Sequence, residues 1–433
     1  MVHSLEDLKS GKLLGLNRLK LACGLTAFPK EILTLADTLE ILDLSDNQLT
    51  ELPDSFSQLK KLKILFFARN NFTVFPHVLA SCKALKIIGF KSNQIVLIPE
   101  NAFPPLLQWL ILTDNKILKL PNSIASSVLL QKCMLAGNQI EELPVEMSNC
   151  VNLELLRVSA NKLKVIPKWL FKLPRVSWIA FAGNPATFPI KSTAKLSTFY
   201  WEDTKIKELL GEGASGVISK AIYLPNNKAI AVKVFKGAVT SDGWPKDEMK
   251  ISMAVGPHKS LIQVLGELKD QDKNKNGLVM ELISPEYFIL GNPPSLESCT
   301  RDIFDENRIF NEGQMLKIVK SIAAVCKQLH SKGINHGDLY AHNILVDKNG
   351  NCLLGDFGAA SSYDVNSALA KTIERTAVRA FGCLLEDVLN LIDANKLDTI
   401  ARARWKEIIL DCSLPVVKDR PSFSQLIEKL TQV

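Results

Sequence analysis

The stretch GINHGDLYAHNILVDKNGNCLLGDFG, residues 333–358, decides which fold the second half of this chain is expected to adopt. It contains two polar clusters, HGDLYAHN at residues 336–343 and DFG at residues 356–358. Between them, the turn-forming residues 347–351 separate two short apolar runs. Turn residues between two β-type runs are typical of a hairpin, so we expect two paired strands here.

The predicted hairpin would hold Asp338, Asn343 and Asp356 near one another on rigid backbone. Carboxylate and amide oxygens are suitable ligands for Mg²⁺. Phosphoryl transfer needs such ligands, and it also needs a carboxylate that receives the proton of the attacking hydroxyl. The spacing H-x-D-L-x-x-x-N followed by D-F-G is a specific pattern, and with it the stretch resembles the eukaryotic-type protein kinases.

A glycine-rich motif lies upstream, where LLGEGASGVI at residues 209–218 gives G-x-G-x-x-G-x-[VI] between two β-type segments. Glycines let backbone amides approach phosphate oxygens, but the motif alone also opens dinucleotide-binding units. Such a unit would need a helix next, whereas the strand-rich AIAVKVF follows at residues 229–235. This segment matches the V-A-I-K strand of kinases, so we expect Lys233 to contact the α and β phosphates of ATP.

The resemblance to kinases continues on both sides of these motifs. A helix predicted over residues 244–254 carries Glu248, the expected ion-pair partner of the strand lysine. Residues 279–282 match the strand that leads into the kinase hinge, with Met280 as gatekeeper. Apolar residues recur at helical spacing over residues 314–330, which predicts a helix with one buried face leading into the catalytic stretch.

The resemblance implies a role for each site residue. The expected catalytic residues are Asp338 as base, Lys233 and Glu248. Asn343 and Asp356 are the expected metal ligands, and the implied cofactors are ATP and Mg²⁺. The residues expected to contact the nucleotide are Gly211, Glu212, Gly213, Ala214, Ser215, Gly216, Ile218, Ala231, Lys233, Met280, Glu281 and Leu345.

The first part of the chain carries an internal repeat instead. Asparagines recur every 22 or 23 residues in the frame L-x-x-L-x-L-x-x-N-x-L-x-x-L-P, and they are Asn47, Asn70, Asn93, Asn115, Asn138, Asn161 and Asn184. This pattern resembles a leucine-rich repeat array of about eight repeats. One repeat is too short to bury its own leucines, so neighbours must stack and share a core. We expect each asparagine amide to bond backbone groups of adjacent turns.

The outward positions of the short strands in this array are unusually apolar. Leucine-rich repeat proteins expose such positions on their concave face, and exposed apolar strips commonly mark a partner site. An intramolecular alternative stays open, in which the kinase-like domain covers this face. The predicted protein-partner surface consists of Ile64, Phe66, Ile87, Trp109, Ile111, Leu155 and Trp178.

Composition indicates the cellular compartment and the classes of partner that are expected. Nine scattered cysteines without a C-x-x-C pair favour a reduced compartment and no structural zinc. The chain starts without an apolar signal region and contains no apolar run long enough to span a membrane, so we expect a cytoplasmic protein. The net charge of +7 is mild for this length. No basic block of the kind that binds nucleic acid is present.

The expected architecture has two domains. A leucine-rich repeat solenoid over residues 1–190 is followed, across a short junction at residues 190–197, by a compact bilobal protein-kinase-like fold over residues 198–433. The N-lobe is expected at about residues 200–284 and the C-lobe at about residues 285–433. This arrangement resembles short bacterial proteins that join leucine-rich repeats to a eukaryotic-like serine/threonine kinase domain.

Several positions depart from the kinase pattern. Gly337 replaces the arginine of H-R-D, so no guanidinium can receive an activation-loop phosphate and control by loop phosphorylation is not expected. Tyr340 stands where serine/threonine kinases place a lysine, and the arginine of tyrosine kinases two residues later is absent too. Ala-Pro is missing before Glu374, for which we expect an ion pair with Arg420. Residues 376–382 lack the aspartate of D-V-W-S-F-G.

Three functions fit these observations. The first is ATP-dependent phosphorylation of serine or threonine hydroxyls, with the repeats recruiting a protein substrate or regulator. The second is a small-molecule kinase of the aminoglycoside or choline type, because those enzymes also contain H-G-D-L-x-x-x-N in their catalytic loop and lack a full activation segment. The third is an ATP-binding pseudokinase scaffold. The intact D-F-G, the fused repeats and the complete set of catalytic residues favour the first.

Overall fold

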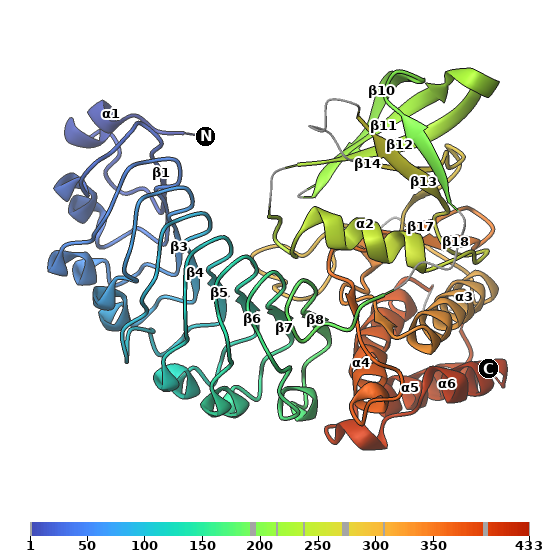
Figure 1. Ribbon diagram of the computed structural model, residues 1–433. Coiled ribbons are helices and arrows are strands. Elements are labelled where there is room, and N and C mark those ends of the chain that lie inside the picture. The colour runs from blue at the N-terminus through green and yellow to red at the C-terminus, as the bar shows by residue number, and fades with distance from the viewer. Residues whose placement is uncertain are drawn as a thin grey trace. The chain divides into compact units, whose positions relative to one another are not determined.

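The computed structural model describes residues 2–190, 196–213, 215–236, 239–270, 277–305, 308–392 and 397–432 (Figure 1). The chain divides into two compact units. The first comprises Met1–Leu173 and Asn184–Ala186, and the second comprises Pro174–Gly183 and Thr187–Val433. Residues 174–183 therefore group with the second unit, although the sequence assigns them to the last repeat. We call them the repeat-end segment. Most of the predicted junction, residues 191–195, lies outside the described residues.

The first unit is a leucine-rich repeat solenoid with one three-residue strand per repeat. Its strands pair in parallel, and Ile41, Ile64 and Ile87 stand opposite one another as the repeat frame predicts. The strands are β1 (Arg18–Lys20), β2 (Ile41–Asp43), β3 (Ile64–Phe66), β4 (Ile87–Gly89), β5 (Trp109–Ile111), β6 (Lys132–Met134) and β7 (Leu155–Arg157). The helical turns are α1 (Leu5–Lys9), η1 (Lys30–Leu35), η2 (Asp54–Gln58), η3 (His77–Ser81), η4 (Asn122–Ser126), η5 (Val145–Asn149) and η6 (Leu170–Lys172).

The repeated asparagines form the predicted ladder of buried hydrogen bonds. Asn138 is typical, because its Oδ1 accepts a bond from the backbone N–H of Ile117 at 3.0 Å. Its Nδ2 donates to the carbonyl oxygens of Leu112 and Leu135, both at 2.9 Å. The other six asparagines also accept a backbone N–H bond from the preceding turn, and all seven distances lie between 2.9 and 3.1 Å. The amides thus satisfy buried backbone groups that the bend would otherwise leave unpaired.

Replacing Asn138 with alanine should lower the free energy of unfolding by about 1–3 kcal/mol, since buried backbone groups would lose their partners. Urea denaturation of the full chain, followed by circular dichroism, measures this change. Lys116→Ala, at an exposed position between the same repeats, is the matched control. If Asn138→Ala were as stable as Lys116→Ala, water would be replacing the hydrogen bonds of the Asn138 amide.

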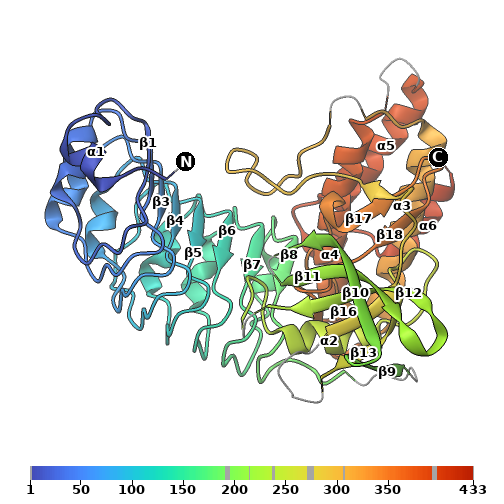
Figure 2. The ribbon, with the colours of Figure 1, turned by 90° about the horizontal axis from the view of Figure 1, so that it is seen from above.

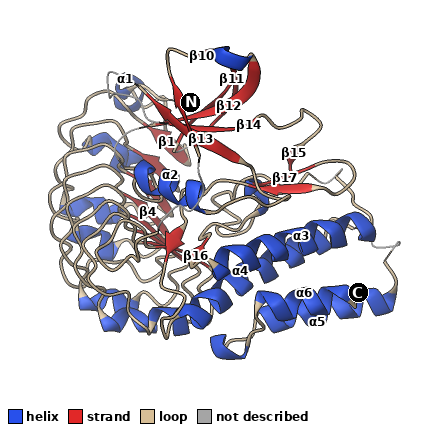
Figure 3. Ribbon diagram, turned by 45° about the vertical axis from the view of Figure 1, so that its right-hand side comes forward, coloured by secondary structure: helices blue, strands red, loops and turns tan. Residues whose placement is uncertain are grey.

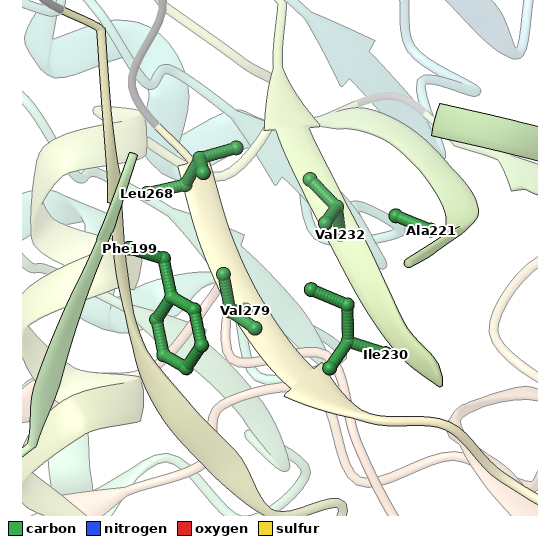
Figure 4. Close-up of a cluster of buried hydrophobic side chains, with 6 residues drawn as sticks. All are labelled: Phe199, Ala221, Ile230, Val232, Leu268 and Val279. Atoms are coloured by element: carbon green, nitrogen blue, oxygen red, sulfur yellow. The ribbon is translucent and has the colours of Figure 1, made fainter. Parts of the chain in front are cut away.

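The second unit begins with a six-stranded sheet in the order β10-β11-β12-β14-β13-β9. One face of this sheet buries Phe199, Ala221, Ile230, Val232, Leu268 and Val279 in one apolar cluster (Figure 4). The strands are β9 (Ser197–Tyr200), β10 (Thr204–Glu212), β11 (Gly216–Tyr223), β12 (Lys228–Phe235), β13 (Val264–Lys269) and β14 (Gly277–Glu281). Helix α2 (Pro245–Ala254) follows β12. The predicted strands at residues 229–235 and 279–282 and the helix at residues 244–254 are confirmed.

Strand β9 was not predicted. It pairs in parallel with β13 at the edge of the sheet (Figure 2). In this pairing, Gly266 stands opposite Ser197. A Cβ added to Gly266 would lie 1.9 Å from the carbonyl oxygen of Ser197. A side chain cannot fit there, so the glycine is what admits this extra strand.

The remainder of the second unit is mainly helical (Figure 3). Helix α3 packs against α4 and α6, and α4 packs against α5. The elements are β8 (Trp178–Ala180), β15 (Phe288–Ile289), α3 (Glu312–Ser331), β16 (Ile334–Asn335), β17 (Ile344–Val346), β18 (Cys352–Leu354), β19 (Ser361–Ser362), α4 (Ala370–Leu389), α5 (Thr399–Cys412) and α6 (Phe423–Thr431). The short 3₁₀ helices are η7 (Leu224–Asn226), η8 (Ala341–Asn343) and η9 (Val417–Asp419). Within the described residues, no helix is both long and apolar enough to cross a lipid bilayer.

Two predictions for this helical part are confirmed. Helix α3 covers residues 314–330, and it starts with a capping box in which Asn311 and Gln314 bond each other's backbone N–H. The hairpin is β17 and β18, which pair antiparallel. Its turn is held by the Asp347 carboxylate, which accepts backbone N–H bonds from Asn349 and Asn351 at 2.9 and 2.8 Å.

The predicted ion pair between Glu374 and Arg420 is wrong. Arg420 is 1% exposed, and its guanidinium donates to the carbonyl oxygens of Leu414, Arg375 and Pro174. Glu374 instead accepts the backbone N–H of Phe423, the first residue of α6. Burial lowers the pKa of Arg420 to about 10. Backbone carbonyl oxygens therefore satisfy the guanidinium of Arg420. The carboxylate of Glu374 lies at the N-terminus of α6, where the helix dipole stabilises a negative charge.

Candidate active site

The loop from β16 to β17 holds Asp338 in place through several hydrogen bonds. The Nδ2 of Asn343 donates both to the carboxylate Oδ2 and to the carbonyl oxygen of Asp338, each at 2.8 Å. The backbone N–H of Asp338 donates to Nδ1 of His336 at 3.3 Å. The other ring nitrogen of His336 lies 3.0 Å from the carbonyl oxygen of Gly355. The buried imidazole therefore connects the loop that carries Asp338 to the strand that leads into Asp356.

Asp356 follows β18 in a conformation that few side chains adopt, with φ at +51°. The backbone N–H of Gly355 bonds the carbonyl oxygen of Asn343 at 3.0 Å, which ties the two predicted metal ligands to one hairpin. The Asp356 carboxylate accepts the N–H of Gly358 at 3.1 Å and lies 3.8 Å from the Nζ of Lys233. Its side chain is 50% exposed.

The surroundings keep Asp356 ionised. Burial alone would raise the pKa of the carboxyl, but the positive charge of Lys233 and the N–H of Gly358 outweigh it and lower the pKa below its ordinary value. An ionised, half-exposed carboxylate is what a hard cation requires.

Lys233 and Glu248 form the expected ion pair between strand β12 and helix α2. Both side chains are buried, with 8% and 4% of their surface exposed. Burial would lower the pKa of Lys233, but the negative charges of Asp356 and Glu248 outweigh it, so the net direction is upward. The lysine therefore carries a full positive charge, and it faces the half-exposed carboxylate of Asp356.

The residues expected around the nucleotide lie on adjacent strands. Ile218 on β11 stands opposite Lys233 on β12, and Ala231 stands opposite Met280 on β14. Gly211 and Glu212 end β10, Gly216 begins β11, Glu281 ends β14, and Leu345 lies in the middle of β17. Ser215 lies in the tip between β10 and β11, whereas Ala214 lies outside the described residues. Glu212 forms an exposed ion pair with Lys236.

The three glycines at the tip between β10 and β11 differ in how much space surrounds them. A Cβ added to Gly211 or Gly213 would meet nothing within 4 Å, so the space beside these two residues is open. A Cβ added to Gly216 would lie 2.5 Å from the carbonyl oxygen of Val234. Gly216 is therefore needed for strand pairing, and Gly211 and Gly213 are the positions where close approach to a phosphate is possible.

The sequence patterns missed one residue of this cluster, Asp302. Its carboxylate lies 2.7 Å from the Nδ1 of His342 and accepts the backbone N–H of the same residue at 3.0 Å. The Nε2 of His342 lies 3.9 Å from the Asp338 carboxylate. Burial would lower the pKa of His342, but the bond to Asp302 and the nearby carboxylates raise it. Asp302 lies in a segment without a motif, so no sequence signal pointed to it.

Comparison with known proteins agrees with this geometry. Residues 204–378 match the protein kinase domain, and residues 37–95 match the leucine rich repeat. The chain thus carries a leucine-rich repeat region and a protein kinase domain.

Similar proteins include the serine/threonine-protein kinase PSK2 of Saccharomyces cerevisiae, 28% identical over 171 residues, which are 37% of this chain and 15% of the yeast protein. The L-type lectin-domain containing receptor kinase SIT1 of Oryza sativa is 30% identical over 164 residues, 36% of this chain and 22% of the rice protein. Fibroblast growth factor receptor 1 of Pleurodeles waltl is 24% identical over 321 residues, 60% of this chain and 39% of the receptor. The chain thus spans well under half of the length of each of these relatives.

Proposed function

We propose that the second unit is an ATP- and Mg²⁺-dependent protein kinase that phosphorylates serine or threonine hydroxyls. The observation that carries the proposal is a charged cluster formed by Lys233 on β12, Asp338 after β16 and Asp356 after β18. The buried Lys233 lies beside the half-exposed carboxylate of Asp356. The carboxylate of Asp338 accepts a hydrogen bond from the side-chain amide of Asn343. The similar yeast proteins are named serine/threonine kinases, which supports the choice of acceptor.

The residues present fit the cofactors that this function requires. Asn343 uses its amide nitrogen on Asp338, so its amide oxygen remains for a cation. Together with ionised Asp356 it would hold Mg²⁺, which neutralises developing charge on the phosphates. Lys233, oriented by Glu248, would bind the α and β phosphates of ATP. Asp338 would accept the proton of the attacking hydroxyl, and its bond from Asn343 holds the carboxylate ready.

The test is transfer of label from radioactive ATP by the pure full-length protein, followed by mass spectrometry of the labelled residues. Labelled serine or threonine supports the proposal, and labelled tyrosine would correct the acceptor. Label found only on added metabolites would favour a small-molecule kinase. Thermal stabilisation by ATP and Mg²⁺ without any transfer would favour a scaffold.

The repeats are proposed to recruit a protein substrate through an apolar strip. Ile64 and Phe66 on β3 and Trp109 and Ile111 on β5 are only partly buried, as a binding surface requires. The predicted surface was too large, because Trp178 is 1% exposed and packs in the second unit. Ile87 and Leu155 are buried as well. The strip therefore consists of Ile64, Phe66, Trp109 and Ile111.

Within the strip, the ring of Trp109 is the largest partly exposed group. Its Nε1 donates to the sulfur of Met134 at 3.5 Å, and the Nζ of Lys132 lies 4.2 Å from the ring centroid. These contacts fix the ring in one orientation before any partner arrives. A rigid aromatic group of this kind is a common centre of protein binding sites.

Trp109→Asp combined with Ile64→Asp should raise the KM for the protein substrate identified by labelling about tenfold or more, because two central apolar contacts would be lost. The kcat and the KM for ATP should not change. Leu118→Asp with Val165→Asp, at two exposed apolar positions outside the strip, is the matched control. An unchanged KM for the substrate in the first variant would exclude this strip as the recruitment site.

A further inference from the structure

The repeat-end segment, residues 174–183, bonds directly to the loop that carries Asp338. The indole Nε1 of Trp178 donates to the carbonyl oxygen of Leu339 at 3.0 Å. The indole ring stacks on Tyr340, with centroids 4.4 Å apart and planes 8° from parallel. The Nδ2 of Asn335 donates to the carbonyl oxygen of Ile179 at 3.1 Å. The start and the middle of the loop that carries Asp338 are thus bonded to this segment.

The same segment also holds the chain that follows Asp356. The hydroxyl oxygen of Ser361 accepts the backbone N–H of Phe181 at 2.8 Å and that of Ala182 at 3.1 Å. Ser361 is fully buried. It therefore fixes the start of the segment that other kinases order by phosphorylation.

A third contact reaches the helix that carries Glu248. Gly183 has φ at +71°, and a Cβ added there would lie 2.6 Å from the Oδ2 of Asp247 and 2.9 Å from the ring of Trp244. Trp244 is the N-cap of α2, and Asp247 and Glu248 lie in the first turn of this helix. The repeat-end segment thus lies against all three parts whose alignment defines an active kinase: helix, catalytic loop and the segment after D-F-G.

Gly337 explains why the segment can approach so closely. Its φ is +74°, and an added Cβ would lie 2.7 Å from the carbonyl oxygen of Ile179 and 2.4 Å from that of Ala359. The arginine that kinases of the H-R-D type carry at this position would not fit against the segment. The glycine at position 337 is therefore required for the segment to lie where it does.

The first half of the segment is anchored to the helical part of the unit. Arg379 of α4 donates to the hydroxyl of Ser177 at 2.8 Å, and Arg420 donates to the carbonyl oxygen of Pro174 at 2.6 Å. Arg420 is the residue that the kinase pattern reserves for an ion pair with Glu374. Here it binds the incoming chain instead.

We infer that the repeat-end segment is a positioning element for phosphoryl transfer, and that it replaces a phosphorylated activation loop. Trp178 and the backbone of Ile179 hold the loop of Asp338, while Ser361 joins the segment to the chain after Asp356. Trp178 is a positioning residue, because it contacts Leu339 and Tyr340 and not the reacting groups. The inference rests on the proposed kinase function, and it implies an active enzyme without loop phosphorylation.

The experiment compares full-length variants in the labelling assay. Trp178→Ala should lower kcat about 10- to 100-fold, because misplacing a catalytic group by one ångström costs rates of this size. The KM for ATP should stay unchanged. Trp178→Phe keeps the stacking on Tyr340 and should recover part of kcat. Ser361→Ala, which removes the bonds to Phe181 and Ala182, should lower kcat in the same way.

Trp405→Phe is the control for general loss of packing. Trp405 is fully buried in α5, so this variant should lose stability while keeping kcat. Phosphatase treatment of the wild-type protein should leave kcat unchanged. Folded Trp178→Ala and Ser361→Ala proteins with wild-type kcat would overturn the inference, as would loss of activity after phosphatase treatment.

A second readout does not depend on activity. Hydrogen exchange of the backbone amides in residues 335–340 and 361–362 should accelerate in Trp178→Ala or Ser361→Ala, whereas exchange in α6 should not change. A wild-type protein that transfers no phosphate would contradict the kinase proposal alone. Unchanged exchange in both variants would contradict the positioning role by itself.

Discussion

Replacing Asp338 with asparagine is expected to lower the rate of phosphoryl transfer by about 10²- to 10⁴-fold, the usual contribution of a general base. The amide has nearly the shape of the carboxylate, and its oxygen can still accept the bond that Asn343 donates to Oδ2 at 2.8 Å. What it lacks is the ability to take a proton. Single-turnover transfer from labelled ATP measures the chemical step.

Binding of ATP should survive the Asp338→Asn change, because Lys233, Asn343 and Asp356 remain. The affinity for a fluorescent ATP analogue with Mg²⁺ therefore serves as an internal control. Asp364→Asn is the matched variant, since this aspartate lies outside the cluster and its oxygen only accepts the N–H of Asn366. A transfer rate within a factor of about two of the wild-type rate would assign the base to another group.

The parts of the structure that follow from local spacing could be predicted from the sequence. The asparagine frame predicted the repeat solenoid, because each turn repeats the same buried amide and the same strand register. The hairpin of β17 and β18 followed from turn residues between apolar runs. In both cases the determining contacts are made by one element with its nearest neighbours in sequence, so a period or a turn signal is sufficient.

The position of Trp178 could not be predicted in this way. It has the same place in the repeat frame as Trp109, and the frame therefore assigned it to the partner surface. Its contacts are to Leu339 and Tyr340, residues that lie far along the chain. A repeat period predicts how each strand pairs with its neighbours within the array. It does not predict which part of the chain packs against the last strand. The sequence shows that Gly337 replaces an arginine, but only the structure shows that the backbone of Ile179 lies in the space beside it.

Arg420 and Asp302 show the same limit in the helical part. The resemblance to kinases suggested Glu374 as the partner of Arg420, which is wrong, because carbonyl oxygens at helix and segment ends leave no sequence signal. Asp302 bonds His342 across a long stretch of chain and belongs to no pattern. Motifs therefore identified the candidate reacting groups, whereas the roles of Trp178 and Asp302 around them became visible only in the structure.

Lys233→Met is expected to abolish productive ATP binding and to destabilise the second unit by about 3–5 kcal/mol, the usual effect of leaving a buried charge without its partner. The reason is the position of Glu248, which is 4% exposed and has its ion pair with this lysine. The double variant Lys233→Met, Glu248→Leu should regain most of the lost stability, because the unpaired carboxylate is removed. It should not regain activity, since no cation would face the phosphates.

The pH dependence of stability tests the same explanation. Burial raises the pKa of Glu248 to about 7 even with Lys233 beside it, and removal of the lysine should raise this pKa further. A carboxyl whose pKa is higher in the folded state binds more protons when folded, so its presence favours folding at low pH and opposes it as the pH rises. The gap in unfolding free energy between the single and double variants should therefore narrow when the pH falls from about 8 to about 6.

An exposed ion pair of the same sheet supplies the control for both measurements. Lys220 lies 2.9 Å from Glu208, and the two side chains are 38% and 62% exposed. Lys220→Met should change stability by less than about 1 kcal/mol, because water screens such pairs and solvates the glutamate that is left. If Lys233→Met were as mild as this control, or if the double variant were no more stable than the single one, Glu248 would not be a buried charge that depends on Lys233. Its assigned role of orienting the lysine toward ATP would then lose its physical basis.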